Sequence, residues 1–309
     1  MEDVQYEGLV LADEYSEEFA PVTLEGPRCL IKLCGQPLID YTIEFLVSNG
    51  VSLVTVFCRH FGEEIQEHVR RRWGGDVGVT VRTVVSATAT CTGDAMIDLL
   101  RDEVIAEDFV MVSGDVVTNL ALAPILRDHQ RRKRGDIHNV MTTVYMETPL
   151  GHATRSQADT NVLVVDPSTG RMLDRDSGSE RAVFVSPEHF RTAPRLVVRN
   201  NLMDAHIDIC SKGVLNIFHD NCDYRRRDDF IRGVLVGSEL KELCYNIHTA
   251  VLSEEYAAPV RDWPTYYAVT RDVLRRYAFP LVPDSNWPPG GVRYYALRDN
   301  VYCSAGGRP

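Results

Sequence analysis

The fold is decided by the stretch GLVLADEYSEEFAPVTLEGPRCL, which occupies residues 8 to 30. Its first four residues, Gly8–Leu11, form a short apolar run of the kind that becomes a buried strand. A strand, a turn and a helix in this order form the usual cradle for phosphate groups in α/β proteins, and the turn is normally rich in glycine. Here the turn from Asp13 to Glu18 is acidic and contains no glycine.

Outward from this stretch, apolar strands and amphipathic helices alternate through the first half of the chain. Continuous apolar strands separated by helices indicate a parallel sheet that is covered on both faces. We therefore predict an α/β, Rossmann-like fold with a mixed, mostly parallel sheet and helices on both faces. The expected strands are Leu53–Cys58, Val79–Val85 and Phe109–Ser113, and the expected helices are Leu38–Asn49, Gly62–Trp73, Gly93–Arg101 and Leu120–Arg134.

The second half is more mixed, with polar stretches that we expect to be surface loops at Thr148–Asp159 and Ser168–Ser179. His206 falls inside a predicted strand and is expected to be a core histidine. Residues 287–309 show little periodicity, so we predict one domain over residues 1–286 followed by a C-terminal linker. Expected strands are Asn139–Met146, Asn161–Asp166, His206–Cys210 and Asn246–Val251, and expected helices are Lys212–Asn221, Asp228–Val236 and Thr265–Tyr277.

Composition excludes several classes of function. The 309 residues carry a formal net charge of −11, which argues against direct nucleic-acid binding because phosphate backbones need a basic face. The eight cysteines show neither a Cys-x-x-Cys pair nor zinc-ligand spacing, and they are typical of buried thiols in a reducing compartment. No apolar run reaches the length of a membrane span. We expect a cytoplasmic protein that binds no membrane.

The acidic turn lies in a frame that resembles the sugar-nucleotide pyrophosphorylases. In that family Leu-Ala is followed by Gly-Gly-x-Gly-Thr-Arg-Leu-x-Pro-Leu-Thr and later by Pro-Lys-x-Leu. The match needs no gap and continues into the helix that follows. The matching residues are Leu11, Ala12, Pro21, Thr23, Pro27, Leu30, Gly35, Pro37, Leu38 and Ile39.

The departures from the family pattern fall on the residues that do its chemistry. Three phosphate-loop glycines are replaced by Asp13, Glu14 and Ser16, the Thr-Arg pair by Glu17 and Glu18, and the lysine by Arg28. Four carboxylates are gained and one guanidinium is lost. A carboxylate about 4 Å from a phosphate oxygen costs about 4 kcal/mol at an effective dielectric of 20, so triphosphate binding should be abolished.

One catalytic-looking element remains. Gly114-Asp115 follows the predicted strand Phe109–Ser113, and the resemblance equates Asp115 with the family's Mg²⁺-binding aspartate. Because the phosphate loop is so altered, we interpret Asp115 as a residue that closes a strand and caps a turn. No cofactor or metal is expected. The family's Gly-Thr-Ala element is only half kept, as Thr92-Gly93-Asp94-Ala95, and Asp262 does not match the second metal carboxylate.

Later segments resemble one branch of this superfamily, the N-terminal nucleotidyltransferase-like domain of the epsilon subunits of eukaryotic translation initiation factor 2B. Those subunits carry Asp-Cys-His-Ile-x-Ile-Cys-Ser, Asn-Phe-Asp-Tyr and Arg-Asp-Asp-Phe-Val-Arg-Gly-Leu-Leu-Val. The similar segments here are residues 204–211 (DAHIDICS), 221–224 (NCDY) and 227–236 (RDDFIRGVLV), and the resemblance extends from about Gly8 to Tyr302.

This resemblance implies a non-catalytic scaffold and docking domain of the guanine nucleotide exchange factor for initiation factor 2. The implied partners are the gamma subunit and other subunits of initiation factor 2B, and the gamma subunit of initiation factor 2. Exchange activity is expected in a C-terminal helical-repeat domain, after a left-handed β-helix, neither of which is present here. The implied partner-binding residues are Asn221, Cys222, Asp223 and Tyr224, with a helix-capping role for Asn221 as the alternative.

Two other functions remain open at this point. One is an active Mg²⁺-dependent sugar-nucleotide pyrophosphorylase, and the other is a sensor that binds a sugar nucleotide without turnover. Both require a phosphate group to sit against Glu17 and Glu18, so the acidic turn disfavours both.

Overall fold

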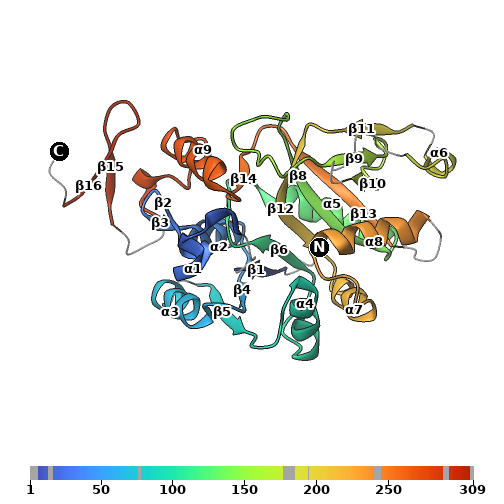
Figure 1. The fold of residues 1–309 in the computed structure, drawn as a ribbon, viewed down its shortest axis with the longest axis horizontal. Coiled ribbons are helices and arrows are strands. Elements are labelled where there is room, and N and C mark those ends of the chain that lie inside the picture. The colour runs from blue at the N-terminus through green and yellow to red at the C-terminus, as the bar shows by residue number, and fades with distance from the viewer. Residues whose placement is uncertain are drawn as a thin grey trace.

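A computed structural model describes the chain over residues 6–12, 17–75, 78–176, 185–193, 195–239, 245–287 and 292–306. Figure 1 shows a central sheet with helices packed against its two faces. The sheet has seven strands in the order β13-β8-β12-β6-β1-β4-β5. Every neighbouring pair in it is parallel except the two pairs that involve β12. The predicted mixed, mostly parallel α/β architecture is therefore confirmed.

The bounds of most elements follow the predicted ones within a few residues. The strands of the central sheet are β1 (Glu7–Leu11), β4 (Leu53–Cys58), β5 (Thr80–Val85), β6 (Phe109–Ser113), β8 (Asn139–Glu147), β12 (Leu202–Cys210) and β13 (Asn246–Leu252). The longer helices are α2 (Leu38–Ser48), α3 (Gly62–Trp73), α4 (Thr92–Arg101), α5 (Leu122–Gly135), α7 (Gly213–Asp220), α8 (Arg227–Glu239) and α9 (Trp263–Leu274).

Short elements complete the described part of the chain. These are β2 (Lys32–Leu33), β3 (Gln36–Pro37), β7 (Val116–Thr118), β9 (Val162–Val165), β10 (Met172–Asp176), β11 (Val197–Arg199), β14 (Ala257–Pro259), β15 (Tyr294–Ala296), β16 (Tyr302–Ser304), α1 (Val22–Glu25), α6 (His189–Thr192), η1 (Glu17–Phe19), η2 (Arg28–Leu30) and η3 (Pro283–Ser285).

Two apolar cores lie on the opposite faces of the sheet. One contains Val10 and Val56 together with side chains from α2, α3 and α5. The other contains Leu9 and Phe57 together with side chains from α4, α7 and α8. Consecutive strand residues thus point into different cores, as the period of two along a strand requires. This is why the strands read as unbroken apolar runs in the sequence.

The carboxyl ends of β1 and β6 meet without room for a side chain between them. The amide of Gly114 donates to the carbonyl of Leu11 over 2.8 Å, and a Cβ on Gly114 would lie 3.0 Å from the Cα of Ala12. Glycine at this position lets the two chain segments touch. The next residue, Asp115, is thereby placed close to the carboxyl end of β1.

Two predictions of local structure were wrong. Residues 172–176 of the predicted loop Ser168–Ser179 form β10. His206 is half-buried rather than in the core, because β12 bulges there and gives His206 a positive φ of 52°. Within residues 287–309, β15 and β16 pair as an antiparallel hairpin. The assignment of this tail as a linker stays a prediction.

Candidate functional site

The acidic turn is only partly within the described residues. Asp13, Glu14 and Ser16 lie outside them, and Glu17 begins the short helix η1. Glu18 is exposed, whereas Phe19 is fully buried and packs edge-on against Trp263 of α9, with ring centroids 5.0 Å apart. An aromatic contact with α9 therefore fixes the position of Phe19, the residue that directly follows the acidic turn.

Arg28 forms a buried ion pair. It is buried in η2, and its Nη2 lies 2.8 Å from Oδ2 of Asp115, which is itself fully buried. The residue that replaces the family's lysine is thus joined in an ion pair to the aspartate that matches the family's metal-binding aspartate. The expectation that Asp115 caps a turn was wrong, since its carboxylate is a buried counter-ion.

A second cation reinforces this arrangement. Nη1 of Arg261 lies 3.8 Å from the same Asp115 oxygen. Asp262, next to it, caps α9: its Oδ1 accepts from the amide of Thr265 at 2.8 Å, and its Oδ2 accepts from the hydroxyl of Ser156 at 2.6 Å. Asp262, the carboxylate considered above as the second metal ligand, is therefore the N-cap of α9.

These residues do not fit a Mg²⁺ ion. A divalent ion on Asp115 would lie about 4 Å from the Arg28 guanidinium, and the repulsion would be about 8 kcal/mol at an effective dielectric of 20. Magnesium also prefers several oxygen ligands in near-octahedral geometry. Within the described ranges, no group of three or more histidine, cysteine, aspartate or glutamate side chains could hold a metal ion.

The predicted docking turn follows α7 directly. Asn221 lies at the C-cap of that helix, and its Oδ1 accepts from the amide of Asp223 at 3.0 Å. The side chain therefore shapes the turn and does not cap the helix carbonyls. Cys222 and Asp223 are exposed and Asn221 is half-exposed, so these three residues lie where a partner could reach them.

Tyr224 has to be removed from the partner-facing residues because its side chain is 6% exposed. Its ring packs edge-on against Phe218 and Phe230. Two glycines make room for it: a Cβ on Gly93 would lie 2.2 Å from the Tyr224 carbonyl oxygen, and a Cβ on Gly233 would lie 2.2 Å from its ring. Tyr224 therefore anchors the turn from below.

A buried ion cluster holds the other end of this turn. Arg227, the first residue of α8, donates to Asp204 through Nη1 at 2.6 Å and to Asp208 through Nη2 at 2.7 Å, and its Nε also pairs with Asp208. Arg175 adds a bond of 3.2 Å to Asp204. Both aspartates and Arg227 are buried. Burial raises the pKa of each carboxyl group, whereas the neighbouring Arg227 guanidinium lowers it. For Asp204 the pairing prevails and lowers its pKa.

The bulge in β12 explains how one guanidinium reaches two carboxylates. Asp204 pairs with Tyr145 and Asp208 with Thr143, so four steps along β12 match two steps along β8. The extra residues bring the aspartates close together on the same side. In the sequence, two of the three segments that resemble the epsilon subunits, residues 204–211 and 227–236, contain these aspartates and this arginine, and the structure brings the two segments together.

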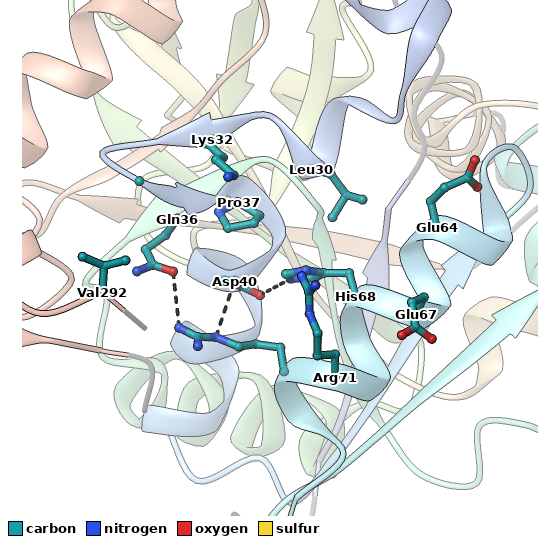
Figure 2. A pocket seen from close by; sticks show the side chains of 12 residues that line it. Leu30, Lys32, Gln36, Pro37, Asp40, Glu64, Glu67, His68, Arg71 and Val292 are labelled. Carbon is teal, nitrogen blue, oxygen red and sulfur yellow. Dashed lines mark hydrogen bonds and ion pairs between the residues drawn. The ribbon is translucent and has the colours of Figure 1, made fainter. Parts of the chain in front are cut away.

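A cleft of about 780 Å³ lies elsewhere, between α2, α3 and the β2–β3 hairpin. Figure 2 shows Asp40 and His68 facing one another at this cleft. The Asp40 Oδ1 accepts from His68 Nε2 at 2.8 Å and from Trp73 Nε1 at 3.0 Å, and Arg72 lies 3.9 Å from its Oδ2. His68 and Trp73 thus satisfy the Asp40 Oδ1, whereas Oδ2 accepts no hydrogen bond from any described residue.

Fold, loop and buried aspartate together define a nucleotidyltransferase-like domain. A model of the nucleotidyl transferase family matches residues 7–164, so the chain belongs to that family. Among curated proteins, the chain is 39% identical over 284 residues to translation initiation factor eIF2B subunit epsilon of Dictyostelium discoideum, covering 91% of this chain and 40% of that protein. It is 40% identical over 285 residues to the Schizosaccharomyces pombe subunit of the same name, covering 91% and 42%.

Similarity to enzymes of the family is weaker and shorter. The chain is 22% identical over 141 residues to a putative mannose-1-phosphate guanyltransferase of Sulfolobus acidocaldarius, covering 46% of this chain and 38% of that protein. The predicted resemblance to the epsilon subunits is therefore confirmed. The chain spans about two fifths of the length of those relatives. In the part of the chain that the structure describes, no helix is long and apolar enough to cross a membrane.

Proposed function

We propose that this chain is a scaffold and docking domain of the guanine nucleotide exchange factor for initiation factor 2, and that it does no nucleotidyl transfer. The observation that most supports this is the buried ion pair between Arg28 and Asp115. It places a fixed cation where a transferase of this fold would need Mg²⁺. The similarity to two epsilon subunits over 91% of the chain supports the link to translation initiation.

Pairing with the gamma subunit of initiation factor 2B and contact with the gamma subunit of initiation factor 2 belong to this proposal, as does a cytoplasmic location. So does an exchange activity located in a C-terminal domain outside these residues. The rival function, a Mg²⁺-dependent pyrophosphorylase, would need Arg28 and Arg261 to leave Asp115. Their departure would uncover a fully buried carboxylate, and transferring such a charge without its partner costs several kcal/mol.

Calorimetry at millimolar ligand tests the absence of transferase function. We expect no binding of GTP, ATP or sugar nucleotides in the presence of Mg²⁺, under conditions in which an active mannose-1-phosphate guanyltransferase binds its substrates. A micromolar dissociation constant for any of these ligands would show that the proposal is wrong. In parallel, the chain alone should not accelerate GDP release from initiation factor 2.

Within this proposal, the turn Asn221–Asp223 is the surface that contacts initiation factor 2. Loops carry contact residues when a rigid scaffold holds them, and here the scaffold is the buried Tyr224. The amide of Asn221 offers both a donor and an acceptor, which suits a contact with another backbone. Cys222 is smaller than the phenylalanine of the epsilon subunits, so any contact made through this position loses an aromatic anchor.

Substitution of Asn221 tests the docking role. Asn221→Ala removes the bond to the Asp223 amide, which is worth about 1 kcal/mol, so the free energy of unfolding should change by no more than that. Binding of the assembled factor to initiation factor 2 should weaken. Asp220→Ala, on the neighbouring exposed residue, is the matched control and should bind as the unmodified chain does. Unchanged binding of the Asn221 variant would rule out the docking role.

A further inference from the structure

Among the described residues, one edge strand of the central sheet is covered by other backbone segments and the other edge strand is open. The outer edge of β13 is covered, because the amide of Thr249 donates 2.8 Å to the carbonyl of Gly170 and Arg171 forms a β-bridge with His248. At the opposite edge, no described element pairs with the outer side of β5, which lies at the margin of the molecule in Figure 1. Every residue of β5 is at least partly exposed.

The direction of the free backbone groups of β5 follows from its pairing with β4. The amide of Thr80 donates to the carbonyl of Ser52, just before β4, over 2.9 Å, and the amide of Ser86 donates to the carbonyl of Cys58, the last residue of β4, over 3.0 Å. In a parallel ladder every second residue bonds to the neighbouring strand. The amides and carbonyls of Val81, Thr83 and Val85 therefore face outward, and no bond from these groups to any described residue is present.

The side chains of these same three residues lie on the face of the sheet that α3 covers. Val81 packs against the core on that face, and Val85 would contact a Cβ on Gly62, the first residue of α3. Beside them a groove of about 680 Å³ runs between the edge of β5 and α3, lined among others by Val81, Thr83 and Arg70. An open strand edge next to a groove is the geometry in which a further strand is added to a sheet.

Both the strand and the helix are complementary to themselves in the antiparallel direction. The outward residues read Val-Thr-Val, so a two-fold axis at Thr83 sets Thr83 opposite itself and Val81 opposite Val85. Each pair then exchanges two backbone hydrogen bonds, because all three residues have outward groups. Cross-strand pairs of β-branched residues are favourable. Natural edges that avoid pairing carry charges, prolines or bulges, and these three positions carry none.

The charges of α3 fit the same symmetry. Glu63 in its first turn and Arg70 in its last turn line the groove beside β5, whereas Glu64, Arg71 and Arg72 line the cleft on the other side of the helix. A two-fold axis at Thr83 makes the two copies of α3 antiparallel neighbours, so the acidic start of one helix faces the basic end of the other. We propose that β5 is an interface at which a second copy of this chain pairs edge to edge, extending the sheet across both molecules.

Sedimentation equilibrium of the 309-residue chain between about 1 and 100 µM tests this proposal. We expect a concentration-dependent mass that rises from 34.8 kDa to twice that value. Thr83→Pro removes an outward N–H without removing a bond to β4, and proline is tolerated on edge strands in that position. It should give a monomer with unchanged far-ultraviolet circular dichroism. Thr83→Val keeps the N–H and the branched side chain, and should still dimerise.

Two further variants keep the test decisive where the proline variant does not fold. Val85→Lys changes a side chain that is 46% exposed and should weaken dimerisation at least tenfold. Arg70→Glu should weaken it as well, and the double variant with Glu63→Arg should restore it. A monomer at every concentration, or dimerisation that is unaffected by these changes at β5 and α3, would overturn the proposal. Association that occurs only with a different chain would overturn it too.

Discussion

Replacing Arg227 by leucine should expose how the buried ion cluster stabilises the domain. Asp204 would keep its 3.2 Å bond to Arg175, whereas Asp208 would lose the guanidinium that contacts both of its oxygens. A fully buried carboxylate without a partner takes up a proton instead.

The expected change in the free energy of unfolding follows from the free energy needed to protonate Asp208. Protonating an aspartate of ordinary pKa, about 3.9, at pH 7 costs about 4 kcal/mol, and at pH 5 it costs about 1.5 kcal/mol. Arg227→Leu should therefore lower the free energy of unfolding by about 4 kcal/mol at pH 7, in the range known for broken buried pairs. In the variant the folded state holds one proton more than the unfolded state, so the loss shrinks as the pH falls.

Urea unfolding at pH 5 and pH 7, followed by circular dichroism, measures both quantities. The double variant with Asp208→Asn should recover most of the loss at pH 7, because a neutral amide needs no proton. The control is Asp208→Asn alone, in which Arg227 keeps its bonds to Asp204. A loss that is the same at both pH values, or a double variant no more stable than Arg227→Leu, would refute this account of the cluster.

Three further predictions concern stability. Asp115→Asn should lower the free energy of unfolding by about 3 to 5 kcal/mol, measured by urea titration, because the buried Arg28 guanidinium loses its ion pair with this carboxylate and the partly buried Arg261 guanidinium loses a longer one; an unchanged or raised stability would contradict this. Gly93→Ala should cost about 1 to 3 kcal/mol in the same assay through its clash with the Tyr224 carbonyl, whereas Gly213→Ala, whose Cβ meets open space, should not. Burial lowers the pKa of His129 from 6.5 to about 4, so the unfolded state binds the proton first and stability should fall by up to about 3 kcal/mol from pH 7 to pH 4, a loss that His129→Gln should reduce.

The sequence predicts those parts of the fold in which one physical signal dominates. The bounds of β4, β6 and α3 were predicted without error, because unbroken apolar runs and a strongly amphipathic charged helix leave one interpretation. β10 and the β15–β16 hairpin were not predicted. In β10 two buried residues are followed by three partly exposed ones, and the residues of β15 and β16 are all partly or fully exposed. Neither segment therefore has the alternation of apolar and polar residues that predicts a strand.

The site shows the same limit. The residue types of Arg28 and Asp115 were noted in the sequence, but their pairing depends on the touching ends of β1 and β6, which only the assembled sheet provides. The burial of Tyr224 depends on Gly233 in the next helix and on Gly93, which is distant from it in the sequence. The sequence does contain one sign of this packing. Gly93 matches the glycine of the family's Gly-Thr-Ala element, although the threonine that follows it there is replaced by Asp94 here.

Strand β12 also has a consequence for how the chain is made. It lies between β6 and β8, both of which precede it by many residues, and it is the strand that joins them. A nascent chain that has emerged only as far as β8 therefore holds the strands β6, β1, β4 and β5, which can pair with one another, and β8 without either of its neighbours, because β12 and β13 both follow it in the chain. Domains with such long-range pairing fold slowly, and their intermediates are prone to aggregate. Ribosome-bound chains that stop before Leu202 should therefore recruit chaperones, and chains that extend past Cys210 should release them.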